Sequence, residues 1–327
     1  MIITKTPLRI SFAGGMSDLP SFYQKQEGAV ISTAINKYIY ITLNKKFDSQ
    51  IRASYSITEF ANSPDELKHE LIREAMKLTE IENGIEITSI SDIPSHGTGL
   101  GSSSTYTVGL LNALYAYKGV LASQHKLSEE ACNIEINKCG KRIGKQDQFI
   151  AGYGGFKFIK FKPDGGVIVD PIICKKETKK KLEDNLLFLY TGVHRKDKKI
   201  LDNASTILEN DKQKHLRVSK LTHLAYDMKH AIEQNDLETF GYLLDKGWKL
   251  KKSIYKNIST GKIDEWYTKA IKNGALGGKL CGAGGGGFLV FYAEKENHKK
   301  IIKSLKELKL VPINFEPQGS KIIYIED

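Results

Sequence analysis

The sequence predicts an α+β fold in two domains. Its length of 327 residues compares with about 150 residues for a typical domain. Strand-like and helix-like segments follow one another in mixed order, and the composition becomes highly charged after Pro171. A repeating strand–helix unit would instead indicate a doubly wound sheet or a TIM barrel. We place the two domains at residues 1–172 and 173–327.

The first of these domains alternates between the two element types. Residues 1–55 alternate like strands and are rich in Ile, Thr and Tyr. Helices are predicted over 65–80, over 105–117, and from Ser128, taken as an N-cap, to Cys139. Strands are expected at 84–91 and, as Gly-rich pairs, over 153–170.

The second domain is expected to be richer in helices. A charged run over 174–185 leads into a strand at 186–190. Helices are predicted over 197–210, 214–234, 236–256 and 264–273. The chain then continues through a Gly-rich segment, a strand at 288–293, a Lys-rich helix at 295–309 and two short strands.

Composition excludes several classes of protein. With 40% hydrophobic and 27% charged residues, the chain is neither disordered nor a disulfide scaffold. No apolar stretch is long enough to span a bilayer, and the start lacks a secretory signal, so we expect a cytoplasmic protein with reduced cysteines and no membrane partner. The net charge of +11 comes mostly from lysine, which favours solubility, or an acidic small substrate, over nucleic-acid binding.

The segment from Gly97 to Ser104 predicts a phosphate-binding loop. Three alternating glycines leave the backbone amides accessible, and the first turn of the following helix presents free N–H groups. A tight turn with a serine cap needs fewer glycines. The loop is not a Walker A motif, and the glycines from 282 to 287 precede a strand, so they are not a dinucleotide-binding fingerprint.

Three further residues each have a structural and a functional interpretation. Glu135 lies on an apolar helix stripe, where it either pairs with a lysine or ligates a metal. Asp147 either forms an Asx turn or a surface ion pair, or acts as a catalytic base. Arg9 either lies on the surface or faces a ligand beside the Gly14-Gly15 pair, where Asp18 could accept sugar hydroxyls.

Three segments in this order resemble the signatures of the GHMP kinases, the family of galactokinase, homoserine kinase and mevalonate kinase. They are PLRISFAGGMSD at 7–18, PSHGTGLGSSST at 94–105 and KLCGAGGGGF at 279–288. The resemblance covers nearly the whole chain. It implies an N-terminal domain like one in a ribosomal protein, a C-terminal ferredoxin-like domain, and a site between them. The first and third signatures are most similar to the branch that phosphorylates C1 of D-glycero-D-manno-heptose 7-phosphate.

The resemblance also implies roles for individual residues. Asp147 and Arg9 would be catalytic, and Glu135 and Ser103 would hold Mg²⁺. The nucleotide-binding residues would be Gly97, Thr98, Gly99, Leu100, Gly101, Ser102, Ser103 and Ser104, which would wrap the phosphates of ATP. The substrate-binding residues would be Gly14, Gly15, Ser17, Asp18, Gly284 and Gly285.

Alternatives remain open at this stage. Galactokinases carry a Glu-His pair where Gly15-Met16 stand here, which argues against galactose. A kinase of mannose, fucose or another free sugar keeps the same chemistry, whereas Arg142, Lys145, Arg195 or Lys279 in the pocket would favour a phosphosugar. A non-catalytic RNA-binding or regulatory relative is a third interpretation. The sequence is compatible with a homodimer but does not determine the oligomeric state.

Overall fold

The computed structural model describes residues 1–94, 97–193, 211–255, 258–282 and 284–326. In order, the elements are β1 (Ile2–Ala13), α1 (Pro20–Tyr23), β2 (Gly28–Lys45), β3 (Ile51–Ser54), β4 (Thr58–Ala61), η1 (Pro64–Glu66), α2 (Glu70–Leu78), β5 (Ile85–Ser91), α3 (Ser102–Tyr117), α4 (Gln124–Cys132), η2 (Asn133–Lys138), α5 (Gln146–Tyr153), β6 (Phe156–Phe161), β7 (Val167–Pro171), α6 (Lys176–Asp184), β8 (Leu186–Tyr190), α8 (Lys212–Glu233), α9 (Leu237–Ile254), α10 (Gly261–Lys272), β9 (Gly277–Leu280), β10 (Phe288–Tyr292), α11 (Lys295–Ser304), β11 (Lys309–Leu310) and β12 (Lys321–Ile325).

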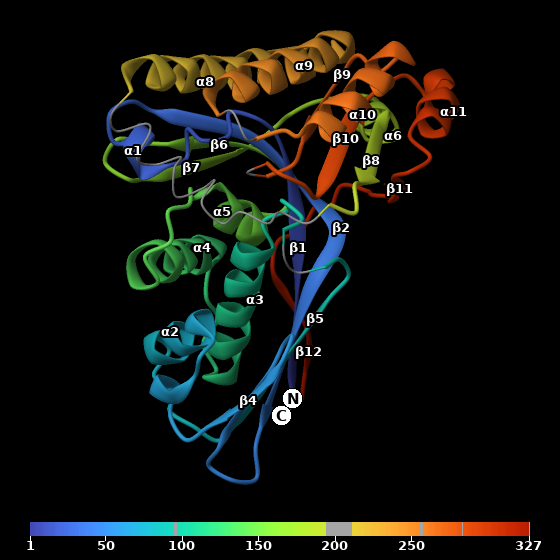
Figure 1. Cartoon of the computed structure of the whole chain (residues 1–327). Coiled ribbons are helices and arrows are strands. Elements are labelled where there is room, and N and C mark those ends of the chain that lie inside the picture. Colours follow the sequence, from blue (N-terminus) through green and yellow to red (C-terminus); the bar gives the residue numbers. More distant parts are fainter. Residues whose placement is uncertain (95–96, 194–210, 256–257, 283, 327) are drawn as a thin grey trace.

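Two sheets organise these elements. An eight-stranded sheet runs in the order β12-β1-β2-β5-β3-β4, with β6 paired to the first half of β2 and β7 to β6. A four-stranded sheet has the order β11-β8-β10-β9. Figure 1 shows α2, α3, α4 and α5 along one side of the long strands, with α8 and α9 crossing one end. The α+β prediction is confirmed.

The last strand returns to the start of the chain. β12 pairs with β1 in antiparallel register, with Ile2 opposite Ile325, so the two termini lie side by side (Figure 1). Thr6 Oγ1 and Ser320 Oγ lie 2.8 Å apart beside this pairing. The C-terminal strand therefore completes the sheet of the N-terminal half, and a domain boundary near residue 172 stays a prediction.

Several element predictions are confirmed, and one cap is wrong. The strand at 186–190 is observed at those residues, and the helix predicted from 236 spans Leu237–Ile254. The helix expected to start at Ser128 begins at Gln124, because the side chain of Ser123 accepts from Lys126 N. Ser128 instead lies inside the helix, where its hydroxyl donates to the Gln124 carbonyl at 2.8 Å. The predicted helix at 197–210 lies outside the described residues.

A shared apolar core joins the two halves of the chain. One large apolar cluster joins β1, β2, β5 and α3 to β8, β10, α8 and α9, with Phe12 edge-on to both Phe156 and Phe240. A second cluster around Trp266 supports the small sheet. Of the helices described, none combines the length and the apolar character that crossing a membrane requires.

Candidate active site

The glycine loop leads directly into α3, as the sequence predicts. Gly97, Gly99 and Gly101 have φ values of 72°, 76° and 76°, which L-residues with a side chain rarely adopt. Gly101 is the N-cap of α3, so the free amides of Ser102 and the residues after it face the loop. These amides and the positive end of the helix dipole suit the binding of phosphate groups.

This loop forms one wall of a cleft of about 1170 Å³. Residues 97–104 all line it, together with Arg9, Gly15, Asp18 and Asp147. At another part of its wall, His69 packs against the rings of Tyr55 and Tyr106. The predicted loop and most of the predicted polar residues are therefore brought together.

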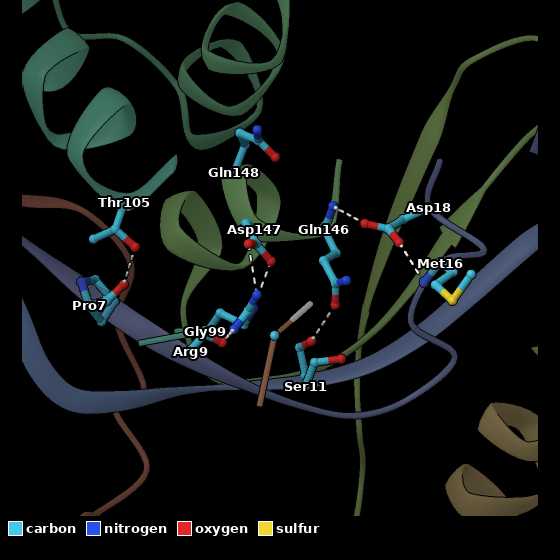
Figure 2. Close-up of polar contacts among 12 residues, drawn as sticks. Pro7, Arg9, Ser11, Met16, Asp18, Gly99, Thr105, Gln146, Asp147 and Gln148 are labelled. Carbon is cyan, nitrogen blue, oxygen red and sulfur yellow. Dashed lines mark hydrogen bonds and ion pairs between the residues drawn. The ribbon is translucent and has the colours of Figure 1, made fainter. Parts of the chain in front are cut away.

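Arg9 and Asp147 form a two-pronged ion pair at the cleft. Arg9 Nε and Nη2 donate to Asp147 Oδ1 and Oδ2, both at 2.7 Å, as Figure 2 shows. Arg9 Nη1 also donates to the Gly99 carbonyl at 2.7 Å. One arginine thus joins β1, the glycine loop and the first turn of α5. Each carboxylate oxygen keeps acceptor capacity for a further donor.

Asp18 is buried next to this pair. Its oxygens accept from the backbone amides of Met16 at 3.1 Å and Gln146 at 3.2 Å (Figure 2). Burial, and then the charge of Asp147, raises the pKa of the Asp18 carboxyl above its usual value. A Cβ at Gly144 would lie 1.9 Å from Asp18 Oδ2, so a larger residue there would displace the Asp18 carboxylate.

Glu135 lies at the other side of the loop, fully buried in the π-helical turn η2. Ser103 Oγ donates to Glu135 Oε1, and Gln148 Nε2 donates to Glu135 Oε2 at 2.6 Å. Lys141 Nζ lies 3.7 Å from Glu135 Oε1. The lysine-paired interpretation of Glu135 therefore describes this structure. The carboxylate also accepts from the hydroxyl of Ser103, which lies in the first turn of α3 at the end of the glycine loop.

The residues predicted to bind substrate do not all lie in one place. Gly15 and Asp18 line the main cleft, and Gly14 lines a small adjoining recess of about 20 Å³. Ser17 is fully buried, and its hydroxyl bonds to the backbone of Gly14 and Ala29 instead of facing the cleft.

The last two predicted substrate residues, Gly284 and Gly285, pack against Ile258, with Gly285 N donating to its carbonyl at 3.0 Å. Neither glycine is among the described residues that line the cleft. Their role in substrate binding stays a prediction.

The sequence predicted only some of the basic residues that line the cleft. Lys279 and Arg142 line it, whereas Lys145 Nζ donates to the Gly165 carbonyl at 2.7 Å, and Arg195 lies outside the described residues. Lys251, which the sequence analysis missed, also lines the cleft. Lys251 lies three residues after buried Trp248, on the apolar stripe of α9, and this position indicates that its side chain faces the interior.

Comparison with known proteins identifies the family. The GHMP kinases N terminal domain matches residues 68–155, and the GHMP kinases C terminal domain matches residues 228–308. A D-glycero-alpha-D-manno-heptose 7-phosphate kinase from Campylobacter jejuni is 31% identical over 94% of this chain and 93% of that protein. The chain belongs to the GHMP kinase family. Both the family resemblance and the two-domain fold predicted from it are confirmed.

Two further proteins are similar to this GHMP kinase. The crystal structure of a D-glycero-D-manno-heptose 1-phosphate kinase from Bacteriodes thetaiotaomicron has a TM-score of 0.81 at 25% identity and covers 100% of both chains. An L-fucokinase/L-fucose-1-P guanylyltransferase from Bacteroides fragilis is 26% identical over 89% of this chain but only 34% of that protein. This GHMP kinase is an ATP-dependent sugar phosphotransferase that acts on a small molecule.

Proposed function

We propose that this GHMP kinase transfers the γ-phosphoryl group of ATP to the anomeric hydroxyl of D-glycero-D-manno-heptose 7-phosphate. The product would be the 1,7-bisphosphate, a precursor for nucleotide-activated heptose. The main support for the proposal is the Arg9–Asp147 pair, because it holds a carboxylate beside the glycine loop in the same cleft. The similarity to the Campylobacter heptose 7-phosphate kinase supports the choice of sugar.

Asp147 is the proposed base. Its carboxylate accepts the proton of the anomeric hydroxyl while that oxygen forms a bond to the γ-phosphorus and the bond from phosphorus to the β–γ bridging oxygen breaks. Arg9 fixes the orientation of Asp147 through two hydrogen bonds and places positive charge next to the transferring group. Asp18, which is buried at the cleft, is proposed to accept hydrogen bonds from hydroxyls of the sugar.

The glycine loop is proposed to bind the phosphates of ATP through the first-turn amides of α3. Glu135 and Ser103 are oxygen donors of the kind that Mg²⁺ prefers, and Gln148 Oε1 beside them is a buried acceptor without a partner among the described residues. Glu135, Ser103 and Gln148 would therefore be the residues that hold a hydrated Mg²⁺ ion. When bound, Mg²⁺ supplies charge neutralisation at the β- and γ-oxygens.

A free sugar is the second candidate, supported by the match to the fucokinase. The two heptose-related proteins also differ in the position of the phosphate in their names, 7-phosphate in one and 1-phosphate in the other. The test is therefore ADP release with ATP and Mg²⁺ from heptose 7-phosphate, heptose 1-phosphate, free heptose, mannose and fucose in parallel.

Phosphorus NMR of the product then identifies the oxygen that was phosphorylated. We expect the highest kcat/KM with heptose 7-phosphate and a new phosphate on C1. Preferential turnover of heptose 1-phosphate or of a free sugar would contradict the proposed substrate. An absence of ADP release from all five sugars would contradict the proposed reaction.

A further inference from the structure

Two lysines of the C-terminal half contribute ammonium groups to the cleft wall. Lys279 is 7% exposed, and its Nζ donates to the carbonyls of Ser11 at 2.7 Å and Phe12 at 3.2 Å. Lys251, in the last turn of α9, is partly buried and donates to the Gly282 carbonyl at 2.6 Å. Each ammonium has three donors. Donors therefore remain on both for a ligand in the cleft.

Among the described residues, no carboxylate oxygen lies within 4.0 Å of the Nζ atom of either lysine. The nearby carboxylates are already engaged. Both oxygens of Asp147 accept from Arg9, and those of Asp18 accept from backbone amides. Placing charge in a partly dehydrated wall is unfavourable without a counter-ion. The site therefore has an excess of positive charge that an anionic ligand would balance.

Ser11 provides an independent observation. Its side chain lines the cleft and is 8% exposed, yet Ser11 Oγ has no hydrogen-bond partner among the described residues. A buried hydroxyl without a partner is destabilising, which points to a ligand atom at this position. Because Lys279 is bonded to the carbonyl of the same residue, the hydroxyl and the ammonium are close together.

Ser11 and the carbonyls that Lys279 binds lie farther along β1 than Arg9, whereas Lys251 binds Gly282 beside the glycine loop. Arg9 and Ser11 lie on the same strand (Figure 2), and side chains two residues apart on one face are about 6.6 Å apart. Arg9 contacts Gly99 of the loop, whereas the lysines line the recess beside Gly14 and Gly15, farther along the strand. A sugar whose anomeric hydroxyl lies at Asp147 could reach this group with its far end.

We propose that Lys279, Lys251 and Ser11 form the subsite for the phosphate monoester that the acceptor sugar already carries. This inference rests on the proposed function, since it names the residues that distinguish a phosphosugar from a free sugar. A phosphate dianion offers acceptor oxygens for both ammonium groups and for the Ser11 hydroxyl. Burial lowers the pKa of Lys279 to about 7 and that of Lys251 to about 8. A bound phosphate dianion would raise both pKa values again and so favour the protonated lysines.

The test compares Lys251→Met, Lys279→Met and Ser11→Ala with the wild-type protein. Lys249→Met is the matched control, because Lys249 lies on the same helix with a side chain that is 68% exposed and paired with Asp245. Steady-state kinetics are measured with heptose 7-phosphate, free heptose and ATP as the varied substrates. If Lys279→Met does not fold, the kinetics of Ser11→Ala and Lys251→Met still test the proposal.

We expect each lysine variant to raise the KM for heptose 7-phosphate roughly 10- to 100-fold, as for loss of a hydrogen bond to a charged group. The preference for the phosphosugar over free heptose should fall at least tenfold, with Lys249→Met within twofold of wild type. An equal rise in the KM for ATP would assign the lysines to the nucleotide and overturn the proposal. Equal losses of kcat/KM with heptose 7-phosphate and with free heptose would overturn the proposal as well.

Calorimetric titration with heptose 7-phosphate in the absence of ATP separates this inference from the proposed function. Wild-type binding that Lys251→Met and Ser11→Ala do not weaken overturns the subsite alone. Binding that these variants weaken, in a wild-type protein that does not turn over any sugar phosphate, supports the subsite and overturns the proposed function.

Discussion

Gly99 and Gly282 meet backbone to backbone, although they belong to the two halves of the chain. A Cβ on Gly282 would lie 2.4 Å from the Cα of Gly99, and a Cβ on Gly99 would lie 2.3 Å from the Cys281 carbonyl. Nearby, a Cβ on Gly287 would lie 2.3 Å from the Thr98 carbonyl. The third glycine-rich segment therefore supports the phosphate-binding loop directly, which explains why both segments need glycine.

Gly282→Ala should disrupt this contact. We expect a loss of about 2–4 kcal/mol in unfolding free energy, from left-handed backbone strain together with overpacking, and a raised KM for ATP. Gly119→Ala is the control, because Gly119 has a similar φ of +72° but a Cβ there would meet nothing within 4 Å. Urea unfolding and ATP kinetics measure both effects. Equal destabilisation of the two variants would show that strain, and not the contact, is responsible.

Asp147→Asn keeps the size of the side chain and removes its capacity to accept a proton. We expect kcat to fall by roughly 10²–10⁴, with a smaller change in the KM for ATP. The neutral amide also loses its ion pair with Arg9, so a thermal melt should accompany the kinetics. Turnover at the wild-type rate would eliminate Asp147 as the base.

Glu135→Gln should weaken binding of the magnesium ion. We expect the Mg²⁺ concentration for half-maximal activity to rise roughly tenfold, because a neutral amide oxygen replaces a carboxylate. Glu70→Gln is a matched comparison, since Glu70 also pairs with Lys141, at 3.3 Å. A Mg²⁺ titration of both variants measures the effect. Identical curves for Glu135→Gln and wild type would make Glu135 a structural residue.

The lowered pKa of Lys279 predicts a pH dependence of stability. An unfolded lysine keeps its proton up to about pH 10.4, whereas burial lowers the pKa of folded Lys279 to about 7. Between these values the folded state binds fewer protons than the unfolded state, so the unfolding free energy rises with pH.

From pH 7.5 to 9.5 we expect the wild-type protein to gain about 1–3 kcal/mol relative to Lys279→Met. Urea unfolding without ligands at both pH values measures this difference, since the other titrating groups are shared by the two proteins. Parallel changes in the two proteins would show that Lys279 stays protonated in the folded state.

The sequence by itself predicted the features that depend on local conformation. Alternating glycines at 97, 99 and 101 imply left-handed backbone and open amides, and all three have positive φ in the structure. Strand 186–190 and helix α9 followed from hydrophobic patterning in the same way. Family resemblance then supplied roles for Arg9, Asp147 and Glu135, which their positions in the sequence left ambiguous.

Only the tertiary structure decided which distant residues meet. Arg9 and Asp147 are separated by 138 residues, and their two hydrogen bonds exist because β1 and α5 pack against each other. A surface position for Arg9 and a turn at Asp147 were also consistent with the local pattern. Nothing in the local sequence shows which groups Lys251 and Lys279 contact. Folding brings Lys251 to Gly282 and Lys279 to Ser11. Local propensity acts over a few residues, whereas a site is assembled by long-range packing.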